Sequence, residues 1–510
     1  MPRVSLLARS TAIALCMPAT AAFADLSGAD VWADWKSYME SNGYDVTASE
    51  ITQGNTLTVN DMTLEFDLSK DVGDGTVAVT MDTVRFIEQG DGSVTMELPA
   101  LTSIDIETTT VDGDTFAATV TYEQTDPIMT ATGDPDALTY DYKSPKLSME
   151  LAGLTVNGTP ISSDVARIGV NMTDIAYTLK TSVAELRNIE QAMTLGALGY
   201  DLAFADPEGD GNVKLAGEIT GITASGSGDL PTDSNPNDLN AMLNDGLDFQ
   251  ANLASVGGNF SLSFSSPDGS GTANSASEGG EINIAIDTDG LLYNAMQRNV
   301  DFNMLITEFP LPLSFSANEV GTGIVMPLQK APEEQGFGFN ISLSDFTMSD
   351  VIWSLFDPSG QLPRDPASLI VDLSGKAKVL FDFLDPTQAL VLEQTGAAPG
   401  ELNALTLNKL ELDAAGAKLT GSGDFTFDNS DLTTFDGVPR PLGELDLSLV
   451  GGNGLLDKLV AMGLVPEQQA MGARLMMGLF AVPGDAPDTL DSRIEINPEG
   501  HVLANGQRIR

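Results

Sequence analysis

The stretch LTVNDMTLEFDL (Leu57–Leu68) alternates apolar and polar residues over most of its length. A period of two is typical of a β-strand with one buried face and one wet face. The same alternation recurs in GTVAVTMD (75–82), VTMEL (94–98), EINIAI (281–286) and GDFTFD (423–428). Threonine and serine fill many of the polar positions, which suits strands that are solvated on one side. The sequence therefore predicts a mainly β fold.

Short Gly- and Asp-rich tips separate these strands. Examples are KDVGDGT (70–76), EQGDGS (88–93), VDGDT (111–115), SPDGSG (266–271) and DTDG (287–290). Gly and Asp tolerate the backbone of tight turns, so the tips predict hairpins. The Asn-Gly pairs in LTVNGTPI (154–161) and VLANGQRI (502–509) predict two more hairpins, the second at the chain end. We expect one or more long, curved antiparallel sheets built of hairpin meanders.

A few segments have helical spacing instead. Ser27–Asn42 predicts an amphipathic helix with Ser27 as its cap. NPNDLNAMLNDGLDFQ (235–250) and SDVIWSLFD (349–357) predict two more helices, and 454–480 predicts a helical hairpin divided at Pro466. The span 183–198 has a helix-like composition but lies between strands, and we interpret it as a strand.

Two similar units are suggested by the two helices that each precede Gly, a short acidic step and alternating strands. The Pro- and Asn-rich stretch LPTDSNPND (230–238) lies between them. We therefore place a boundary near residue 232, between a β domain over 25–232 and a second helix-led β domain over 233–510. The two can also form one continuous sheet.

The N-terminus has the pattern of an export signal. Arg3 and Arg9 precede a short apolar run, and Ala22-Phe23-Ala24 suits cleavage after Ala24, so residues 1–24 are predicted to be a signal peptide. Cleavage would remove Cys16, the single cysteine, and leave no thiol for a disulfide. We expect a periplasmic protein.

The charge of the chain restricts its partners. Its formal net charge is −49, with 73 acidic and 24 basic residues. Such a charge repels phosphate backbones and anionic membrane surfaces, so nucleic acid is not expected to bind. A well-solvated surface explains the charge most simply.

No catalytic signature is present, and we expect a protein that is not an enzyme and holds no cofactor. The single histidine, His501, lies beside a predicted turn, and no Gly-x-Ser-x-Gly motif occurs. DPEGDGNVKLAGE (206–218) spaces Asp206, Glu208 and Asp210 as a weak calcium candidate, but Gly217 holds the twelfth position and the flanks look like strands. A hairpin tip is the preferred interpretation, and no metal site is expected.

The apolar hairpin GLLDKLVAMGLVPEQQAMGARLMMGLF (454–480) leaves three alternatives open. It packs on the sheet as core or end cap, it lines a groove of the curled sheet, or part of it lies on a bilayer. The candidate groove-lining residues are Leu459, Met462, Met476, Leu479 and Phe480. Methionine is flexible and polarizable, which suits varied apolar ligands.

Several stretches together resemble an alphaproteobacterial family, domain of unknown function 2125. They are the Trp-x-x-Trp helix, PLPLSF (310–315), LFDPSGQLPRDPASLIVDLSGKA (355–377), APGELNALTLNKLELDAAGAKLTGSGDFTFDNSDLTTFDG (398–437) and the segments around AMGARLMMGLFAVPG (470–484) and HVLANGQRIR (501–510). The resemblance implies an exported envelope protein and no particular reaction. PLGELDLSLVGGNGLLDKLVAMGLV (441–465) is more loosely similar to the ends of AsmA-like envelope proteins, which implies long curved sheets that handle lipids. We expect this chain to depart from those proteins in lacking an N-terminal membrane anchor.

Two functions follow from these observations. In the first, an apolar groove of the curled sheet binds or shields a lipid or another hydrophobe in the periplasm. In the second, the apolar faces are mutually buried, and the protein is a structural or interaction module of the envelope with a protein partner and no small-molecule ligand.

Overall fold

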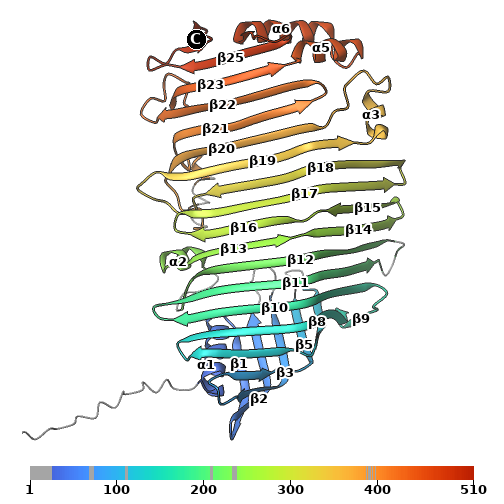
Figure 1. Ribbon diagram of the computed structural model, residues 1–510, viewed down its shortest axis with the longest axis vertical. Coiled ribbons are helices and arrows are strands. Elements are labelled where there is room, and N and C mark those ends of the chain that lie inside the picture. Colours follow the sequence, from blue (N-terminus) through green and yellow to red (C-terminus); the bar gives the residue numbers. More distant parts are fainter. Residues whose placement is uncertain are drawn as a thin grey trace, which may run out of the picture.

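The computed structural model describes residues 26–67, 74–109, 113–206, 209, 211–232, 238–385, 388, 392, 394–396 and 398–510. These residues form one 27-stranded sheet in which each strand pairs antiparallel to its neighbours. Most strands lie across the long axis and follow one another in chain order, with α1 near the lower end and α5 and α6 at the upper end (Figure 1). The predicted mainly β fold of hairpin meanders is confirmed.

The N-terminal end of the sheet is overlaid by α1 (Gly28–Ser41). Ser27 caps this helix as predicted, because its hydroxyl accepts from the backbone N–H of Asp30 while the Asp30 carboxylate accepts from Ser27. The strands here are β1 (Asp45–Gln53), β2 (Thr56–Asp67), β3 (Asp74–Glu88), β4 (Val94–Glu97), β5 (Leu101–Thr109), β6 (Thr115–Thr125), β7 (Ile128–Asp134), β8 (Ala137–Val156) and β9 (Thr159–Ile161).

The middle of the sheet is made of ten strands. They are β10 (Ala166–Val183), β11 (Leu186–Ala205), β12 (Asn212–Pro231), β13 (Asp248–Ser255), β14 (Gly257–Ser266), β15 (Gly269–Ser277), β16 (Gly280–Asp287), β17 (Gly290–Ile306), β18 (Phe309–Met326) and β19 (Gln335–Met348). Two short helices lie at strand ends, α2 (Leu239–Asn244) and α3 (Asp350–Phe356). The span 183–198 lies in strands, as interpreted from the sequence. The helix expected within 235–250 is present as α2, and the chain then turns at Gly246 and enters β13 at Asp248, in the predicted order of helix, Gly and strand.

The C-terminal end consists of β20 (Ala367–Val379), β21 (Gly400–Ala414), β22 (Ala417–Asp428), β23 (Arg440–Val450), α5 (Gly452–Ala461), α6 (Glu467–Phe480), β24 (Val482–Pro483), β25 (Thr489–Ile496), β26 (Val502–Ala504) and β27 (Gln507–Arg508). The predicted helical hairpin is therefore present. The final Asn-Gly hairpin is also confirmed, since Asn505 and Gly506 have φ values of 50° and 79° and join β26 to β27. Among the described residues, no helix is both long and apolar enough to cross a bilayer.

The sheet continues across residue 232. β12 pairs with β13 through one half of its length and with β14 through the other half. β17 likewise pairs with both β15 and β16, because these are two halves of one long strand interrupted at Glu278-Gly279. The described residues on the two sides of 232 therefore share one hydrogen-bonded sheet.

A line of left-handed residues crosses the middle of the strands, and we call it the crease. Its members with positive φ include Asp61 (50°), Asp126 (42°), Asp174 (50°), Gly221 (59°), Asn299 (46°) and Asp345 (51°). Asp, Asn and Gly are the residues that adopt this conformation at least cost. The line bends the sheet along its length.

At the crease, the apolar positions of a strand change between even and odd residue numbers. In β10, Met172 precedes Asp174 on an even position and Ile175 follows it on an odd position, yet both pack in one apolar cluster. One inserted residue thus moves the apolar positions from even to odd numbers while the apolar face stays on the same side. The alternation seen in the sequence therefore restarts at each crease residue.

The apolar face is the concave side of the bend. Asp174 and Asn299, which lie on the crease, are exposed, and Val256 on the same line is 69% exposed. The residues that flank the crease on the other face are buried: Leu147, Ile175, Leu195 and Ile222 are 4–7% exposed. Two halves of the sheet thus converge on an apolar floor.

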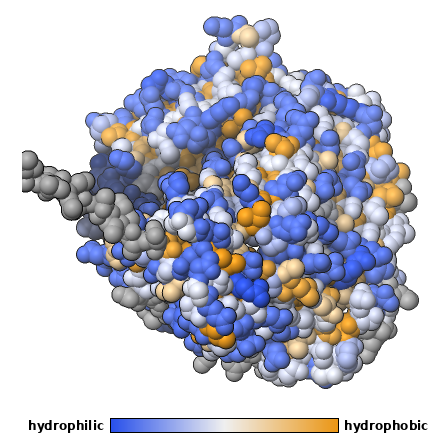
Figure 2. All heavy atoms as spheres, turned by 60° about the horizontal axis from the view of Figure 1, so that its bottom comes forward, coloured by the Kyte–Doolittle hydropathy of each residue, from blue (hydrophilic) through white to orange (hydrophobic). Residues whose placement is uncertain are grey.

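At the N-terminal end this floor is covered and becomes a core. α1 places Val31 and Trp32 against Phe86, which is fully buried. The ring centroids of Trp32 and Trp35 lie 6.1 and 5.5 Å from that of Phe86. Viewed toward this end, the surface is mostly hydrophilic with scattered apolar spots (Figure 2).

A buried ion pair fixes α1 to the strands. The Arg187 guanidinium donates to the Asp34 carboxylate at 2.8 Å, and the Tyr140 hydroxyl donates to the other carboxylate oxygen at 2.7 Å. Burial raises the pKa of Tyr140 well above its usual range. Every polar partner of this cluster lies within the fold, so we assign it a structural role.

Candidate functional site

An apolar trough follows the crease beyond the N-terminal core. One wall is a row of paired residues on successive strands, β13 and β16 to β21: Leu253, Ile282, Ala295, Thr322, Ile341, Val371 and Leu410. Directly paired residues point to the same side of a sheet, so this row forms one continuous surface. We use the name trough for this wall, the opposite wall described next, and the floor between them.

The opposite wall carries a ladder of phenylalanine rings. Phe302 stacks on Phe315 with centroids 5.2 Å apart and an angle of 6° between the ring planes. Phe260 and Phe346 extend the ladder at 6.5 Å from Phe302 and 6.2 Å from Phe315. These strand halves lie across the crease from the first wall, so aromatic and aliphatic surfaces face one another.

A hollow of about 570 Å³ lies along the first wall beside the crease. Ile219 reaches it from one side, and Leu253, Val320 and Ile341 reach it from the other. Small residues leave the space open: they include Gly280 and Ala295. Among the described residues that line it, Glu281 is the charged one. Its volume and apolar lining fall within the range of small-molecule binding sites.

Side chains of the trough are incompletely covered. Leu253, Val320 and Ile341 are 40%, 42% and 37% exposed, although each lies in the interior of a sheet. The nearby Ile324 and Phe339 are also about two-fifths exposed. Contiguous exposed apolar surface of this kind is uncommon on soluble proteins and marks binding sites.

The trough extends toward the C-terminus through five leucines of β21. They are Leu402, Leu405, Leu407, Leu410 and Leu412, and each pairs with a trough-facing position of β20 or β22. Their spacing alternates between three and two residues. Irregularities in the β20–β21 register accommodate each extra residue, so all five leucines remain on one face.

The opposite, convex face carries a polar row beside the hollow. Asn252, Asn283, Asn294, Gly323, Asn340 and Asp372 form a paired row on neighbouring strands. The Asn252 amide donates to the Asn283 amide oxygen at 2.7 Å. Adjacent positions in one strand, such as Asn294 and Ala295, therefore face water and the trough respectively.

The groove-lining residues predicted from the sequence lie elsewhere. Leu459 and Met462, within or just after α5, and Phe480 of α6 are half-buried, whereas Met476 and Leu479 of α6 are 52% and 53% exposed. None of the five lines the hollow. They lie together at the C-terminal end of the sheet, where α6 contacts α5 and β25.

The residues around the hollow were missed by sequence reasoning, although EINIAI (281–286) was recognised as a strand. The signal that could have found them is an interruption: an Asp, Asn or Gly in mid-strand after which the apolar phase shifts by one. Small residues at apolar positions beside that interruption, such as Gly280 and Ala295, would then mark the widest part of the crease.

The calcium candidate lies at a hairpin tip. Asp206 directly follows β11, and β12 begins at Asn212, so the flanks are strands as preferred from the sequence. Glu208 and Asp210 lie outside the described residues. Within the part of the chain that the structure describes, no group of three His, Cys, Asp or Glu residues is placed to hold a metal ion.

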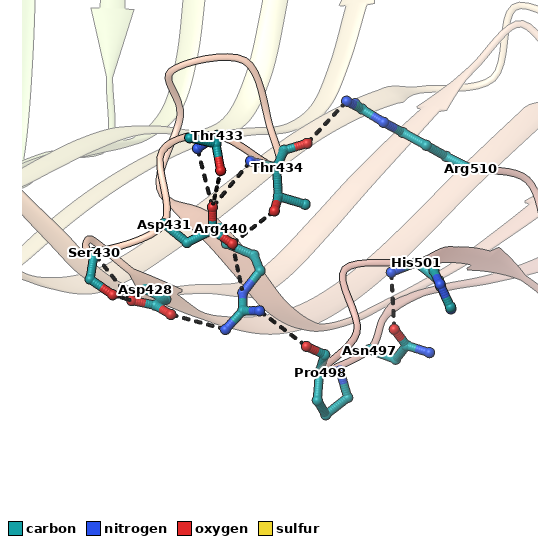
Figure 3. Close-up of polar contacts among 10 residues, drawn as sticks. All are labelled: Asp428, Ser430, Asp431, Thr433, Thr434, Arg440, Asn497, Pro498, His501 and Arg510. Atoms are coloured by element: carbon teal, nitrogen blue, oxygen red, sulfur yellow. Dashed lines mark hydrogen bonds and ion pairs between the residues drawn. The ribbon is translucent and has the colours of Figure 1, made fainter.

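His501 lies near a dense polar cluster between β22, β23 and the chain end (Figure 3). The His501 backbone N–H donates to the Asn497 side chain at 3.0 Å. Arg440 pairs with Asp428 at 2.9 Å and donates to the Pro498 carbonyl at 3.1 Å. Arg510 donates to the Thr434 carbonyl at 3.2 Å. These contacts hold loops to one another.

Asp431 is the most strongly perturbed acid of this cluster. Its carboxylate accepts from the Thr434 hydroxyl at 2.8 Å and from the backbone N–H groups of Thr433 and Thr434, both at 3.1 Å. These bonds, led by that of the Thr434 hydroxyl, lower the pKa of Asp431 to about 2. A carboxylate held ionised by its own loop is a structural anchor, not a general acid.

Comparison with known proteins gives one family. No curated protein matches the chain. A family model described as "Uncharacterized protein conserved in bacteria (DUF2125)" matches residues 211–504, from the start of β12 to β26. The match includes most of the trough and both C-terminal helices, and the chain belongs to the DUF2125 family.

Proposed function

We propose that this chain is an exported, periplasmic, non-enzymatic protein that binds or shields the apolar part of a lipid or another hydrophobe in the trough. One observation carries the proposal: the trough wall stays about two-fifths exposed around a 570 Å³ hollow, in a protein whose net charge is −49. A strongly solvated chain gains nothing from uncovered apolar surface unless something occupies it.

The alternative, an envelope module without a ligand, requires the apolar faces to cover one another. Phe86 and Val59 satisfy that requirement at the N-terminal end, where α1 closes the crease. The exposure of Val320 and Ile341 favours a ligand in the middle of the sheet.

The chemistry of the trough favours flexible apolar chains. Its walls are aliphatic and aromatic, and Glu281, which pairs with Met296 beside trough-facing Ala295, directs its carboxylate to the opposite face. The net charge of −49 disfavours an anionic headgroup, so we expect the bound molecule to carry a neutral, zwitterionic or cationic polar end.

The test is to purify the protein from cells that contain their membranes, extract it with organic solvent and measure lipid by mass spectrometry. We expect a hydrophobe in near-stoichiometric amount. The direct probe is a fluorescent fatty-alcohol analogue titrated into delipidated protein.

Two substitutions at adjacent positions separate the trough from the convex face. Ala295→Trp fills the hollow and should weaken binding of the probe roughly tenfold or more, because a filled pocket excludes the apolar chain of the probe. Asn294→Trp adds the same side chain to the polar face and should leave binding within roughly twofold. A lipid-free extract with no probe binding would favour the envelope module, and equal binding by both variants would place the ligand elsewhere.

A further inference from the structure

α6 exposes an apolar side that the fold leaves uncovered. Met471, Leu475 and Leu479 are 67%, 75% and 53% exposed, and their spacing of four residues places them on one side of the helix. Met476 beside them is 52% exposed. We call these four residues the α6 stripe. Ala470 is fully buried on the side that faces the protein.

The stripe is held outward by contacts on the other side of the helix. Arg474 forms an ion pair with Asp457 of α5. The Phe480 carbonyl, at the end of α6, accepts from the Ser492 hydroxyl at 2.7 Å and from the Asn505 amide at 3.0 Å. The helix cannot turn its apolar side toward β25 without losing these bonds.

The size of the stripe decides between two kinds of occupant. From Met471 to Leu479 the helix rises about 12 Å, so the stripe offers a few hundred Å² at most. A stable protein interface needs about 800 Å² from each partner. A bilayer surface has no such threshold, because each apolar side chain that enters the interface contributes separately.

The charge of α6 also favours a lipid surface over a protein partner. α6 carries one acid, Glu467, and one base, Arg474, and is neutral within a chain of net charge −49. It lies beyond β25 at the end of the sheet, away from most of the acidic strands (Figure 1). A surface without net charge can approach this end without the repulsion that an anionic surface would meet.

We propose that α6 docks the C-terminal end of the sheet onto a lipid surface with zwitterionic or neutral headgroups, with the α6 stripe inserted among them. The docking does not depend on a hydrophobe in the trough. It would place the leucine-lined end of the trough, at β21 and β22, closest to the membrane.

The experiment is co-sedimentation of the purified full chain with phosphatidylcholine vesicles. Combining Met471→Ser, Leu475→Ser and Leu479→Ser should reduce partitioning roughly 100-fold, because three apolar side chains no longer leave water. The matched control combines Ile51→Ser, Leu101→Ser and Ile128→Ser, three apolar residues of similar exposure (52%, 59% and 60%) at the N-terminal end, and should bind within roughly twofold of the parent.

Vesicles with phosphatidylglycerol sharpen the test. The parent chain should bind them less well than phosphatidylcholine at low salt and recover in ~0.5 M salt, because screening removes the repulsion. Equal vesicle binding by the α6 triple variant would overturn the proposal. So would a dimer of the parent chain, measured by light scattering, that the triple variant loses. Circular dichroism verifies folding, and the probe titration separates this outcome from failure of the trough proposal.

Discussion

Two parts of the crease share the same left-handed backbone conformation, but one part is filled by side chains and the other is open. Between β8 and β12 the floor is filled by Leu147, Ile175, Leu195 and Ile222, and α1 closes the sheet just beyond it. Around β13 to β19 the corresponding floor contains Gly280 and Ala295, and a hollow remains. The bend is set by residues that tolerate positive φ, whereas side-chain size and a covering helix decide whether the concave face becomes a core or an open surface.

The largest effect expected from this comparison is at Phe86. Phe86→Ala removes a fully buried ring between Trp32 and Trp35 and should lower the free energy of unfolding by about 3–5 kcal/mol. Denaturant titration followed by tryptophan emission measures the loss at that end, because two of the three tryptophans contact Phe86.

Phe339→Ala is the matched variant in the trough. Phe339 is 42% exposed, so its truncation should cost about 1 kcal/mol or less. Similar losses at the two positions would show that the trough wall is packed as tightly as the core, and the distinction between the two regions would fail.

The next effect tests the crease where the two regions join. Gly221 has a φ of 59°, and an added Cβ would lie 2.1 Å from a methyl carbon of Val256. Gly221→Ala should therefore lower the free energy of unfolding by roughly 2–3 kcal/mol, from backbone strain and from the clash.

Val256→Ala separates these two causes. Val256 is 69% exposed, so this substitution alone should be nearly neutral. Combined with Gly221→Ala, it should recover the part of the lost unfolding free energy that is due to the clash. A loss of about 1 kcal/mol, due to backbone strain at residue 221, should remain. Additive losses in the double variant would mean that the two residues do not meet across the crease.

Much of this architecture could be predicted from the sequence because it follows from local patterns. Alternation in LTVNDMTLEFDL and Asn-Gly at 505–506 specify strands and turns through interactions of near neighbours. Ser27 and Asp30 specify the start of α1 in the same way. Antiparallel pairing of consecutive strands then requires little more than short connections.

The hollow could not be predicted, because it depends on residues far apart in the chain. Ile219 and Ile341 come from strands separated by more than a hundred residues and meet at the crease. Sequence reasoning followed local apolar density and chose Leu459, Met462, Met476, Leu479 and Phe480. Apolar density at helical spacing shows that a surface will be apolar, but it does not show which surface the fold leaves uncovered.

The smallest expected effect is a difference in the acid sensitivity of the two ends of the molecule. The N-terminal end is closed by apolar packing, whereas the loops near the C-terminus depend on the Asp431 carboxylate. The pKa of Asp431 is about 2 in the folded protein, below the value of about 3.9 of a free aspartate. The Asp431 contribution is therefore fully present above about pH 4 and is lost as the pH falls toward 2.

We expect amides of residues 429–439 to lose hydrogen-exchange protection between pH 4 and pH 2, after correction for the intrinsic exchange rate. Amides of residues 57–64 in β2 should stay protected over the same range, because the fully buried Val59 and Met62 carry no charge. Asp431→Asn should make the loop exchange faster at pH 7 and remove its dependence on pH below 4, because the amide cannot titrate. Simultaneous loss of protection in both segments would mean that acid unfolds the sheet as one unit. The apolar N-terminal end and the polar C-terminal loops would then differ in composition but not in their stability toward acid.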